Sequence, residues 1–361
     1  MRARAVIGSG FGDEGKGLMT DYLCAQGAGV VVRFNGGAQA GHTVVTPAGD
    51  RHVFSHFGSG TLLGVPTFLS QFFICNPLFA LGEADELLAM NCKPELYAHP
   101  NCLVTTFADM IINQRREEAR GAKRHGSVGL GINETVTRSE ALDHLKITMS
   151  DLWNHVPLED RLSEICRKYA EFRTGIKIEN ADDMIAHFIR MCEKFAAAVH
   201  PLGIQQCEDP VFEGAQGLLL DQDNKEFYPH VTRSNTGMKN VRTLCDQAGI
   251  SDIDTYYVSR TYLTRHGAGP LPGENPKLKF EDNTNIPNRW QGTMRFAPLD
   301  TDALLRRCHE DAGGYSSVGG PKFKLVLTHC DQHAPPCLAH LYANGPTRAD
   351  ISTTPRRAKV A

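Results

Sequence analysis

The hydrophobic residues of the chain form short continuous runs, separated by longer stretches in which apolar positions recur at helical spacing. Six apolar runs predict strands, at residues 5–7, 30–34, 72–74, 210–212, 255–258 and 323–328. A nearly continuous run such as "VVVRF" is typical of a strand buried on both faces of a sheet. Apolar residues at 184, 185, 188, 191, 195 and 199 predict an amphipathic helix. This alternation predicts an α/β fold with a large, mostly parallel central sheet flanked by helices.

No repeat or linker interrupts the pattern, so we expect residues 1–361 to form a single domain. The segment 113–123 is predicted as a charged, exposed helix, and the polar stretch after Arg348 as a disordered tail. The net charge of −3 suggests no nucleic acid partner, and no apolar stretch is long enough to span a membrane. The 11 cysteines are odd in number and form no C-x-x-C pair, which indicates reduced thiols and a cytoplasmic protein.

A glycine-rich loop follows the first predicted strand. Residues 10–16, "GFGDEGK", fit the pattern G-x-x-x-x-G-K, in which backbone N–H groups and a lysine hold a phosphate. Gly17 stands where that pattern has the Ser or Thr that binds Mg²⁺, and the loop carries two carboxylates of its own. Asp13 can supply the metal ligand or act as a base. The alternative is a glycine-rich turn with a structural lysine.

Three further stretches place polar side chains in glycine-rich turns directly after predicted strands. They are "RFNGGAQAGHTVV" at 33–45 with His42, "FEGAQGLLLDQD" at 212–223 with Gln216, and "SRTYLTRHGAGPLP" at 259–272 with Arg265. Because ligands of parallel sheets bind outside the carboxyl ends of the strands, each turn is a candidate part of one site.

Together, the four stretches resemble the adenylosuccinate synthetase family. The motifs that carry the resemblance are "GDEGKG" at 12–17, "GGAQAGHT" at 36–43, "EGAQGLLLD" at 213–221 and "TRHGAGPLP" at 264–272. Weaker matches follow in the same order at 119–132, 228–236, 327–331 and 345–348. The resemblance implies a P-loop-like fold and a ligase. In such a ligase a nucleoside triphosphate phosphorylates O6 of a purine nucleotide, and the amine of L-aspartate then displaces phosphate from C6.

The resemblance also implies the roles of individual residues. The catalytic residues are Asp13 as the base at N1 of the purine, His42 and Lys16 at the phosphoryl group, and Gln216 at the 6-position. Mg²⁺ is bound by Asp13 and the Gly41 carbonyl. Nucleotide and phosphate contacts are implied for Gly12, Glu14, Gly15, Gly17, Gln39, Ser127, Val128, Arg138, Thr232, Arg265, Asp331, Gly345 and Pro346. Arg138 reaches the site of a neighbouring subunit, which implies a homodimer, and Arg289 and Arg295 bind aspartate.

Several departures from the family pattern bear on the substrates. Gln39 replaces an Asn, Ser127 and Val128 replace paired Thr, and "NRWQGTMRF" at 288–296 is a reduced form of the arginine-rich aspartate loop. In "THCD", residues 328–331, His329 replaces the Lys beside the donor base. This pattern resembles the bacteriophage branch of the family. That branch joins aspartate to dGMP with ATP or dATP, giving N6-succino-2-amino-2′-deoxyadenylate in the host cytoplasm. The alternative is a conventional enzyme that uses IMP and GTP.

Two readings without this chemistry remain open. The segment "HCDQHAPPCLAH" has the density of His and Cys found in zinc sites, with His329, Cys330, His333, Cys337 and His340 as candidate ligands. A regulatory nucleotide switch is the other reading. It predicts nucleotide binding without aspartate-dependent release of phosphate.

Overall fold

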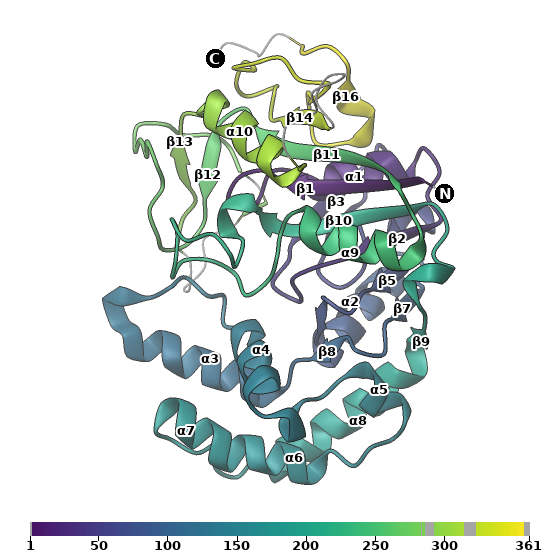
Figure 1. The fold of residues 1–361 in the computed structure, drawn as a ribbon, viewed down its shortest axis with the longest axis vertical. Coiled ribbons are helices and arrows are strands. Elements are labelled where there is room, and N and C mark those ends of the chain that lie inside the picture. The colour runs from purple at the N-terminus through teal and green to yellow at the C-terminus, as the bar shows by residue number, and fades with distance from the viewer. Residues whose placement is uncertain (1, 283, 286–291, 314–322, 357–361) are drawn as a thin grey trace.

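The computed structural model describes residues 2–282, 284–285, 292–313 and 323–356. Its centre is a ten-stranded sheet (Figure 1). In order across the sheet, the strands are β16 (Ile351–Ser352), β15 (Leu341–Ala343), β14 (Lys324–Thr328), β11 (Asp252–Arg260), β1 (Arg2–Gly8), β10 (Pro210–Gly217), β2 (Val30–Arg33), β5 (Thr67–Leu69), β7 (Leu96–Ala98) and β9 (His200–Pro201). Neighbouring strands are parallel except β15 and β16. The predicted α/β fold with a mostly parallel sheet is confirmed.

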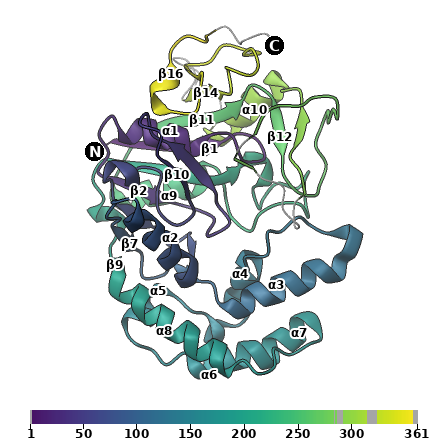
Figure 2. The ribbon, with the colours of Figure 1, turned by 180° about the vertical axis from the view of Figure 1, so that it is seen from behind.

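The central strands are buried on both faces, as their apolar runs predict. Successive residues of a strand point to opposite faces, and the strand β1 shows this clearly. Ala5 and Ile7 pack with α9 (Met238–Ala248) and α10 (Thr301–Asp311), whereas Val6 packs with α1 (Lys16–Cys24) on the other face. The sheet is therefore the middle layer between α1 on one side and the pair α9 and α10 on the other (Figures 1 and 2).

The remaining helices form a separate layer at the end of the molecule opposite β16 (Figures 1 and 2). They are α2 (Pro77–Ala89), α3 (Phe107–Arg120), α4 (Ile132–Ala141), α5 (Met149–Trp153), α6 (Glu159–Glu164), α7 (Ala170–Thr174) and α8 (Asp182–Ala198). The predicted amphipathic helix corresponds to α8, which buries Ile185, Phe188 and Phe195. Except for α4, these helices share one hydrophobic cluster. None of the described helices is both long and apolar enough to cross a membrane.

Three small sheets complete the fold: β3 (His42–Val45) with β4 (Arg51–Phe54), β12 (Leu263–Arg265) with β13 (Arg295–Ala297), and β6 (Ile74–Cys75) with β8 (Leu103–Val104). Single helical turns are η1 (Thr61–Leu63), η2 (Gly121–Lys123), η3 (Asp143–Leu145), η5 (Ile204–Gln206), η6 (Leu218–Leu220) and η7 (Arg348–Asp350), and η4 (Ile165–Tyr169) is a π-helical segment.

Three local predictions differ from the structure in part or in full. The strand expected at 72–74 is displaced: the sheet strand is β5, and only Ile74 of the predicted run is extended, in β6. The helix expected at 113–123 begins six residues earlier, at Phe107, and buries Asn113 and Glu117, because α4 packs along it. The stretch after Arg348 is ordered up to residue 356, because β16 pairs with β15.

Candidate functional site

The glycine-rich loop between β1 and α1 lies at the centre of the sheet, because β1 has β10 and β11 as its neighbours. The chain turns through left-handed conformations at Gly12, Asp13 and Gly15, with φ of 94°, 60° and 94°. Asp13 is the exception among these, since non-glycine residues rarely adopt positive φ. Thr328, the last residue of β14, donates its hydroxyl to the Glu14 carbonyl at 2.8 Å. The loop is therefore fixed by strand ends on both sides of β1.

Glu14 occupies the anion cradle of its own loop. Its carboxylate accepts the backbone N–H groups of Gly10 at 3.0 Å and Gly12 at 2.8 Å, and the ammonium of Lys16 at 2.6 Å. The side chain is 3% exposed. Without a ligand, the Glu14 carboxylate fills the place of an external anion, and its contact with a nucleotide phosphate stays a prediction.

Gly17 is required by its neighbours. A Cβ at this position would lie 3.0 Å from the Cβ of His42 and 3.1 Å from the hydroxyl of Ser59, closer than ordinary van der Waals contact. A Ser or Thr, the usual residue of a phosphate loop, would force His42 or Ser59 to move by a few tenths of an ångström. The space is used to bring His42 against the start of α1.

His42 and Glu213 form a buried pair beside Lys16. The Nδ1 of His42 lies 2.8 Å from a Glu213 carboxylate oxygen, and Ser59 donates both its N–H, at 3.0 Å, and its hydroxyl to the same carboxylate. Burial alone would raise the pKa of Glu213, but His42, Arg33 and Ser59 lower it to about 2. Burial lowers the pKa of His42, with Glu213 opposing. At neutral pH an uncharged imidazole therefore donates from Nδ1, which leaves Nε2 directed elsewhere.

Two amide side chains meet without partners close to this pair. Gln216 at the end of β10 and Gln39 after β2 both approach Gly36, where a Cβ would lie 3.4 Å from each amide group. The Oε1 of Gln216 and both amide atoms of Gln39 are buried without a hydrogen-bond partner. Because buried polar groups are nearly always paired, these three atoms indicate a site that is completed by a polar ligand.

Asp13 has the chemistry of a base and of a hard metal ligand. Burial raises the pKa of its carboxyl, while Arg260 and Lys16 oppose that change. Arg260 also donates to the Asp13 carbonyl at 2.6 Å. Within the described residues no side chain is hydrogen-bonded to the Asp13 carboxylate, so it is available to a ligand. A carboxylate and the exposed Gly41 carbonyl are oxygen donors of the kind that Mg²⁺ prefers.

Arg138 corrects the sequence prediction. It is fully buried inside α4, and its guanidinium forms a two-point ion pair with Asp109 at 2.9 and 2.8 Å. Its remaining donors bond to the carbonyls of Leu145 and Val104. A side chain held in this way does not reach a neighbouring subunit or a nucleotide phosphate. The expected homodimer stays a prediction.

We expect Arg138→Met to act on folding. Removing the guanidinium leaves the buried Asp109 charge unpaired, a change that costs about 3–5 kcal/mol in other proteins. Urea unfolding should show that loss, while the dissociation constants of nucleotides for the folded protein should stay close to wild type. Arg233→Met is the control, because Arg233 forms an exposed ion pair with Glu140 on the same helix, worth at most about 1 kcal/mol. Unchanged stability with weakened nucleotide binding would restore the original assignment.

Arg265 and Arg295 are also engaged within the chain. Arg265 donates to the carbonyls of Pro270 and His230, both at 2.8 Å, and its guanidinium lies 4.3 Å from the ring centre of Phe11. Arg295 donates to Glu274 and to the carbonyls of Gly267 and Gly269, all at 2.8 Å. Both arginines donate to carbonyl groups of the turn at 266–270, and their contacts with a nucleotide and with aspartate stay predictions. Arg289 lies outside the described residues.

The other predicted nucleotide contacts lie on four separate segments. Ser127 uses its hydroxyl within the chain, donating to Asn113 at 2.9 Å and accepting from Gly129, while Val128 beside it is half-buried. The backbone of Thr232 donates to Leu220 at 2.8 Å, which holds its loop beside the end of β10. Asp331 is exposed after β14. Gly345 and Pro346 follow β15. Two residues further on, Arg348 forms an ion pair with Asp21 of α1 at 3.0 Å.

An aromatic cluster lies beside Asp331. Tyr262 and Phe280 are stacked with ring centres 3.6 Å apart, and His329 meets Tyr262 edge-on at 5.8 Å. Burial, with help from Arg260, holds the pKa of His329 well below its usual range, so the ring is uncharged. Within the described residues, which include 329–340, no three His, Cys, Asp or Glu side chains are placed to hold a metal ion. The zinc reading therefore gains no support.

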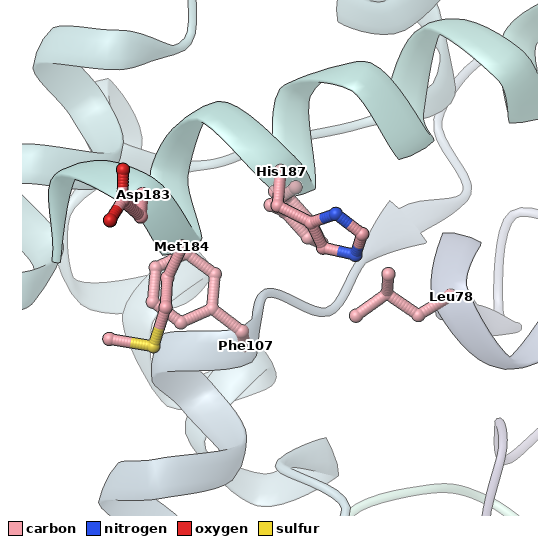
Figure 3. Close-up of a pocket in the computed structure, with 6 residues that line it drawn as sticks. Leu78, Phe107, Asp183, Met184 and His187 are labelled. Carbon is pink, nitrogen blue, oxygen red and sulfur yellow. The ribbon is translucent and has the colours of Figure 1, made fainter.

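A hollow of about 240 Å³ lies elsewhere, between α2, α3 and α8 (Figure 3). It is lined by Leu78, Phe107, Asp183, Met184, His187 and Phe188. None of these residues was predicted for the site. The residues of the candidate site instead gather at the carboxyl ends of β1, β2 and β10.

Glu213 and Ser59 are site residues that the sequence analysis did not single out. The sequence does contain a signal for Glu213. It is an acidic residue inside the apolar run of a buried strand, and charged residues there are almost always paired. Ser59 had none. Its contact with Glu213 joins residues 154 positions apart, so only the folded chain shows it.

An anion loop after the central strand of a parallel sheet, with a buried lysine at the start of the following helix, defines a nucleotide-binding α/β protein. The family model described as adenylosuccinate synthetase matches residues 5–291. The chain therefore belongs to the adenylosuccinate synthetase family.

Sequence relatives agree with this membership. The adenylosuccinate synthetase of Pseudomonas fluorescens (strain SBW25) is 32% identical over 285 residues, covering 74% of this chain and 64% of the relative. That of Picrophilus torridus is 31% identical over 306 residues, 83% of this chain and 70% of the relative. The chain thus spans just under two thirds of the length of the first of these relatives.

Two solved structures share the fold. Fully ligated adenylosuccinate synthetase from Plasmodium falciparum superposes with a TM-score of 0.73 at 20% identity, covering 92% of this chain and 77% of the other. Cyanophage S-2L succinoaminodeoxyadenylate synthetase, bound to dGMP and dATP, superposes with a TM-score of 0.67 at 17% identity. That match covers 99% of this chain and 96% of the other.

Proposed function

We propose that this protein is a ligase that joins L-aspartate to C6 of a 6-oxopurine nucleotide, driven by a nucleoside triphosphate. The observation that carries the proposal is the meeting of Asp13, Lys16 and the His42–Glu213 pair at the carboxyl end of β1. It unites a base, a phosphate-binding cation and a phosphoryl-stabilising donor. The family membership supports the same chemistry. A zinc module explains none of these contacts.

The proposed roles begin with activation of the purine oxygen. Asp13 removes the N1 proton, so that electron density moves to O6 and the oxygen becomes nucleophilic. Burial raises the pKa of the Asp13 carboxyl, which makes its carboxylate a stronger base. Gln216 and Gln39 use their unpaired amides to hold the base. Mg²⁺ bound by Asp13 and the Gly41 carbonyl would neutralise charge on the donor phosphates.

His42 and Lys16 act on the phosphoryl group in transit. An anion that arrives at Nε2 favours a protonated imidazole, and the buried Glu213 carboxylate stabilises that cation through Nδ1. The protonated Nε2 then donates to the charge that develops during transfer. To bind the phosphoryl group, Lys16 has to exchange its present partner. Its ammonium now pairs with Glu14 and can exchange that carboxylate for a phosphate oxygen.

The identity of the purine nucleotide has two candidates. IMP, with GTP as donor, is favoured by the sequence relatives, which are named adenylosuccinate synthetases. For dGMP with ATP or dATP, the supporting observation is the uncharged His329 beside stacked aromatic rings, at the position where the family pattern has a lysine. A half-buried, uncharged ring such as that of His329 can pack on a purine without supplying a charge specific to guanine.

A set of substrate combinations tests both the ligase reaction and the identity of its two nucleotides. IMP, GMP and dGMP are each offered with aspartate and crossed against GTP, ATP and dATP, and the release of phosphate is measured. We expect release that depends on aspartate in at least one combination. IMP with GTP as the fastest pair supports the conventional enzyme, and dGMP with ATP or dATP supports the second candidate. Nucleotide binding without aspartate-dependent release would contradict the ligase and favour a nucleotide switch.

A further inference from the structure

Glu83 of α2 holds a loop that the proposed chemistry does not use directly. Its carboxylate accepts four hydrogen bonds from three consecutive residues that follow β4. They come from the N–H and hydroxyl of Ser55 at 2.9 and 2.5 Å, from the N–H of His56 at 2.7 Å, and from the N–H of Phe57 at 3.3 Å. The Glu83 side chain is 5% exposed. One buried side chain therefore fixes the whole start of this loop.

The same loop ends at the His42–Glu213 pair. After Phe57, the N–H of Gly58 donates to Thr67 at 2.8 Å, and Ser59 donates its N–H and hydroxyl to Glu213. Glu213 in turn bonds to Nδ1 of His42 at 2.8 Å. Hydrogen bonds at the two ends of the segment 55–59 thus connect α2, through the backbone of this segment, to Glu213 and His42.

We propose that Glu83 is a positioning residue for His42. The loop 55–59 has no helix or strand of its own, so its conformation depends on the groups that bind its N–H donors. Glu83 fixes one end, and this places Ser59 at the distance at which both of its donors reach Glu213. The orientation of the Glu213 carboxylate then sets the plane of the imidazole and the direction of Nε2. This inference rests on the proposed function for its catalytic consequence, but not for its structural part.

The surroundings of Glu83 favour a carboxylate over an amide. His52 Nε2 lies 3.8 Å and His56 Nδ1 3.6 Å from it, and Glu86 approaches His52 from the next turn of α2 at 4.0 Å. The four groups that face Glu83 all donate a hydrogen, so each needs an acceptor. A carboxylate offers only acceptors. A glutamine would turn an NH₂ group toward donors and break about half of the contacts.

The test compares Glu83→Gln with Glu86→Gln. Glu86 is the matched control, because it lies on the same helix with a side chain that is 73% exposed. We expect Glu83→Gln to lower kcat about 10- to 100-fold, as displaced catalytic groups do in other enzymes. The KM values for both nucleotides and aspartate should stay within about twofold. Glu86→Gln should match the wild type. Ser55→Ala, which removes only one of the four hydrogen bonds, should give a smaller loss of kcat in the same direction.

Two measurements do not depend on activity. In protein labelled with ¹⁵N-histidine, the Nδ1–H resonance of His42, identified by its loss in His42→Asn, should shift in Glu83→Gln and stay in place in Glu86→Gln. Amide hydrogen exchange of residues 55–59 should accelerate only in Glu83→Gln. A folded Glu83→Gln protein with an unchanged resonance and wild-type kcat overturns the inference. Lack of ligase activity in the wild type would contradict the proposed function, whereas the resonance and exchange data would still decide the link from Glu83 to His42.

Discussion

Asp13→Asn is expected to abolish turnover while leaving nucleotide binding largely intact. The substitution keeps the size of the side chain and removes its ability to accept the purine N1 proton. General bases contribute about 10²- to 10⁴-fold to rates. Loss of a metal-binding carboxylate at the same atom adds to that effect, so kcat should fall by about 10³-fold or more. Phosphate release measures the rate, and calorimetric titration with each nucleotide measures binding.

The control for this experiment is Asp50→Asn, which removes an exposed carboxylate from the turn between β3 and β4. It should keep wild-type turnover. The left-handed conformation at Asp13 does not complicate the comparison, because Asn tolerates positive φ as readily as Asp. Turnover of Asp13→Asn at the wild-type rate would remove Asp13 as the base.

His42→Asn should lower kcat about 10²- to 10³-fold and change KM little, because the missing donor acts on charge that develops only during transfer. The Asn amide can still donate to Glu213 from roughly the position of Nδ1, so the buried carboxylate keeps a partner. Only Nε2 is lost. Steady-state kinetics over a range of both nucleotides separates kcat from KM.

His42→Ala is the companion variant and tests the pair itself. It removes Nε2 and also unpairs Glu213, whose pKa of about 2 depends on His42. Both variants should lose activity alike, while only His42→Ala should also lose free energy of unfolding at neutral pH. A rise in KM with unchanged kcat in His42→Asn would mean that His42 serves binding and not the transfer.

Glu14 shows how the structure changes the interpretation of the phosphate loop. In the sequence it is an acidic residue in an anion-binding motif, an arrangement that invites a role toward the ligand. In the folded protein its carboxylate is bound by the N–H groups that would hold a phosphate, and Lys16 neutralises it. The spacing of glycines is therefore sufficient to predict an anion cradle. It does not say which anion fills it.

Arg138 shows a second limit. The resemblance implies a nucleotide contact for Arg138, but the sequence does not show what surrounds its side chain. The environment decides its role, since Asp109 is 29 residues away in sequence and faces it across two packed helices. Arg265 and Arg295 show the same limit. Their guanidinium groups donate to backbone carbonyls of the turn at 266–270, and only the fold shows these contacts.

The sequence by itself determined the parallel α/β sheet, the strand–loop–helix around Lys16 and the order of the four glycine-rich turns, because these depend on local periodicity and on backbone freedom. It also placed Asp13, His42 and Gln216 at strand ends that share one edge of the sheet. Only the tertiary structure decided that Glu14 fills the loop, that Arg138 is buried, and that a series of contacts links Glu83 to His42. Those features depend on partners distant in sequence, whose distances and orientations are fixed only when the layers pack.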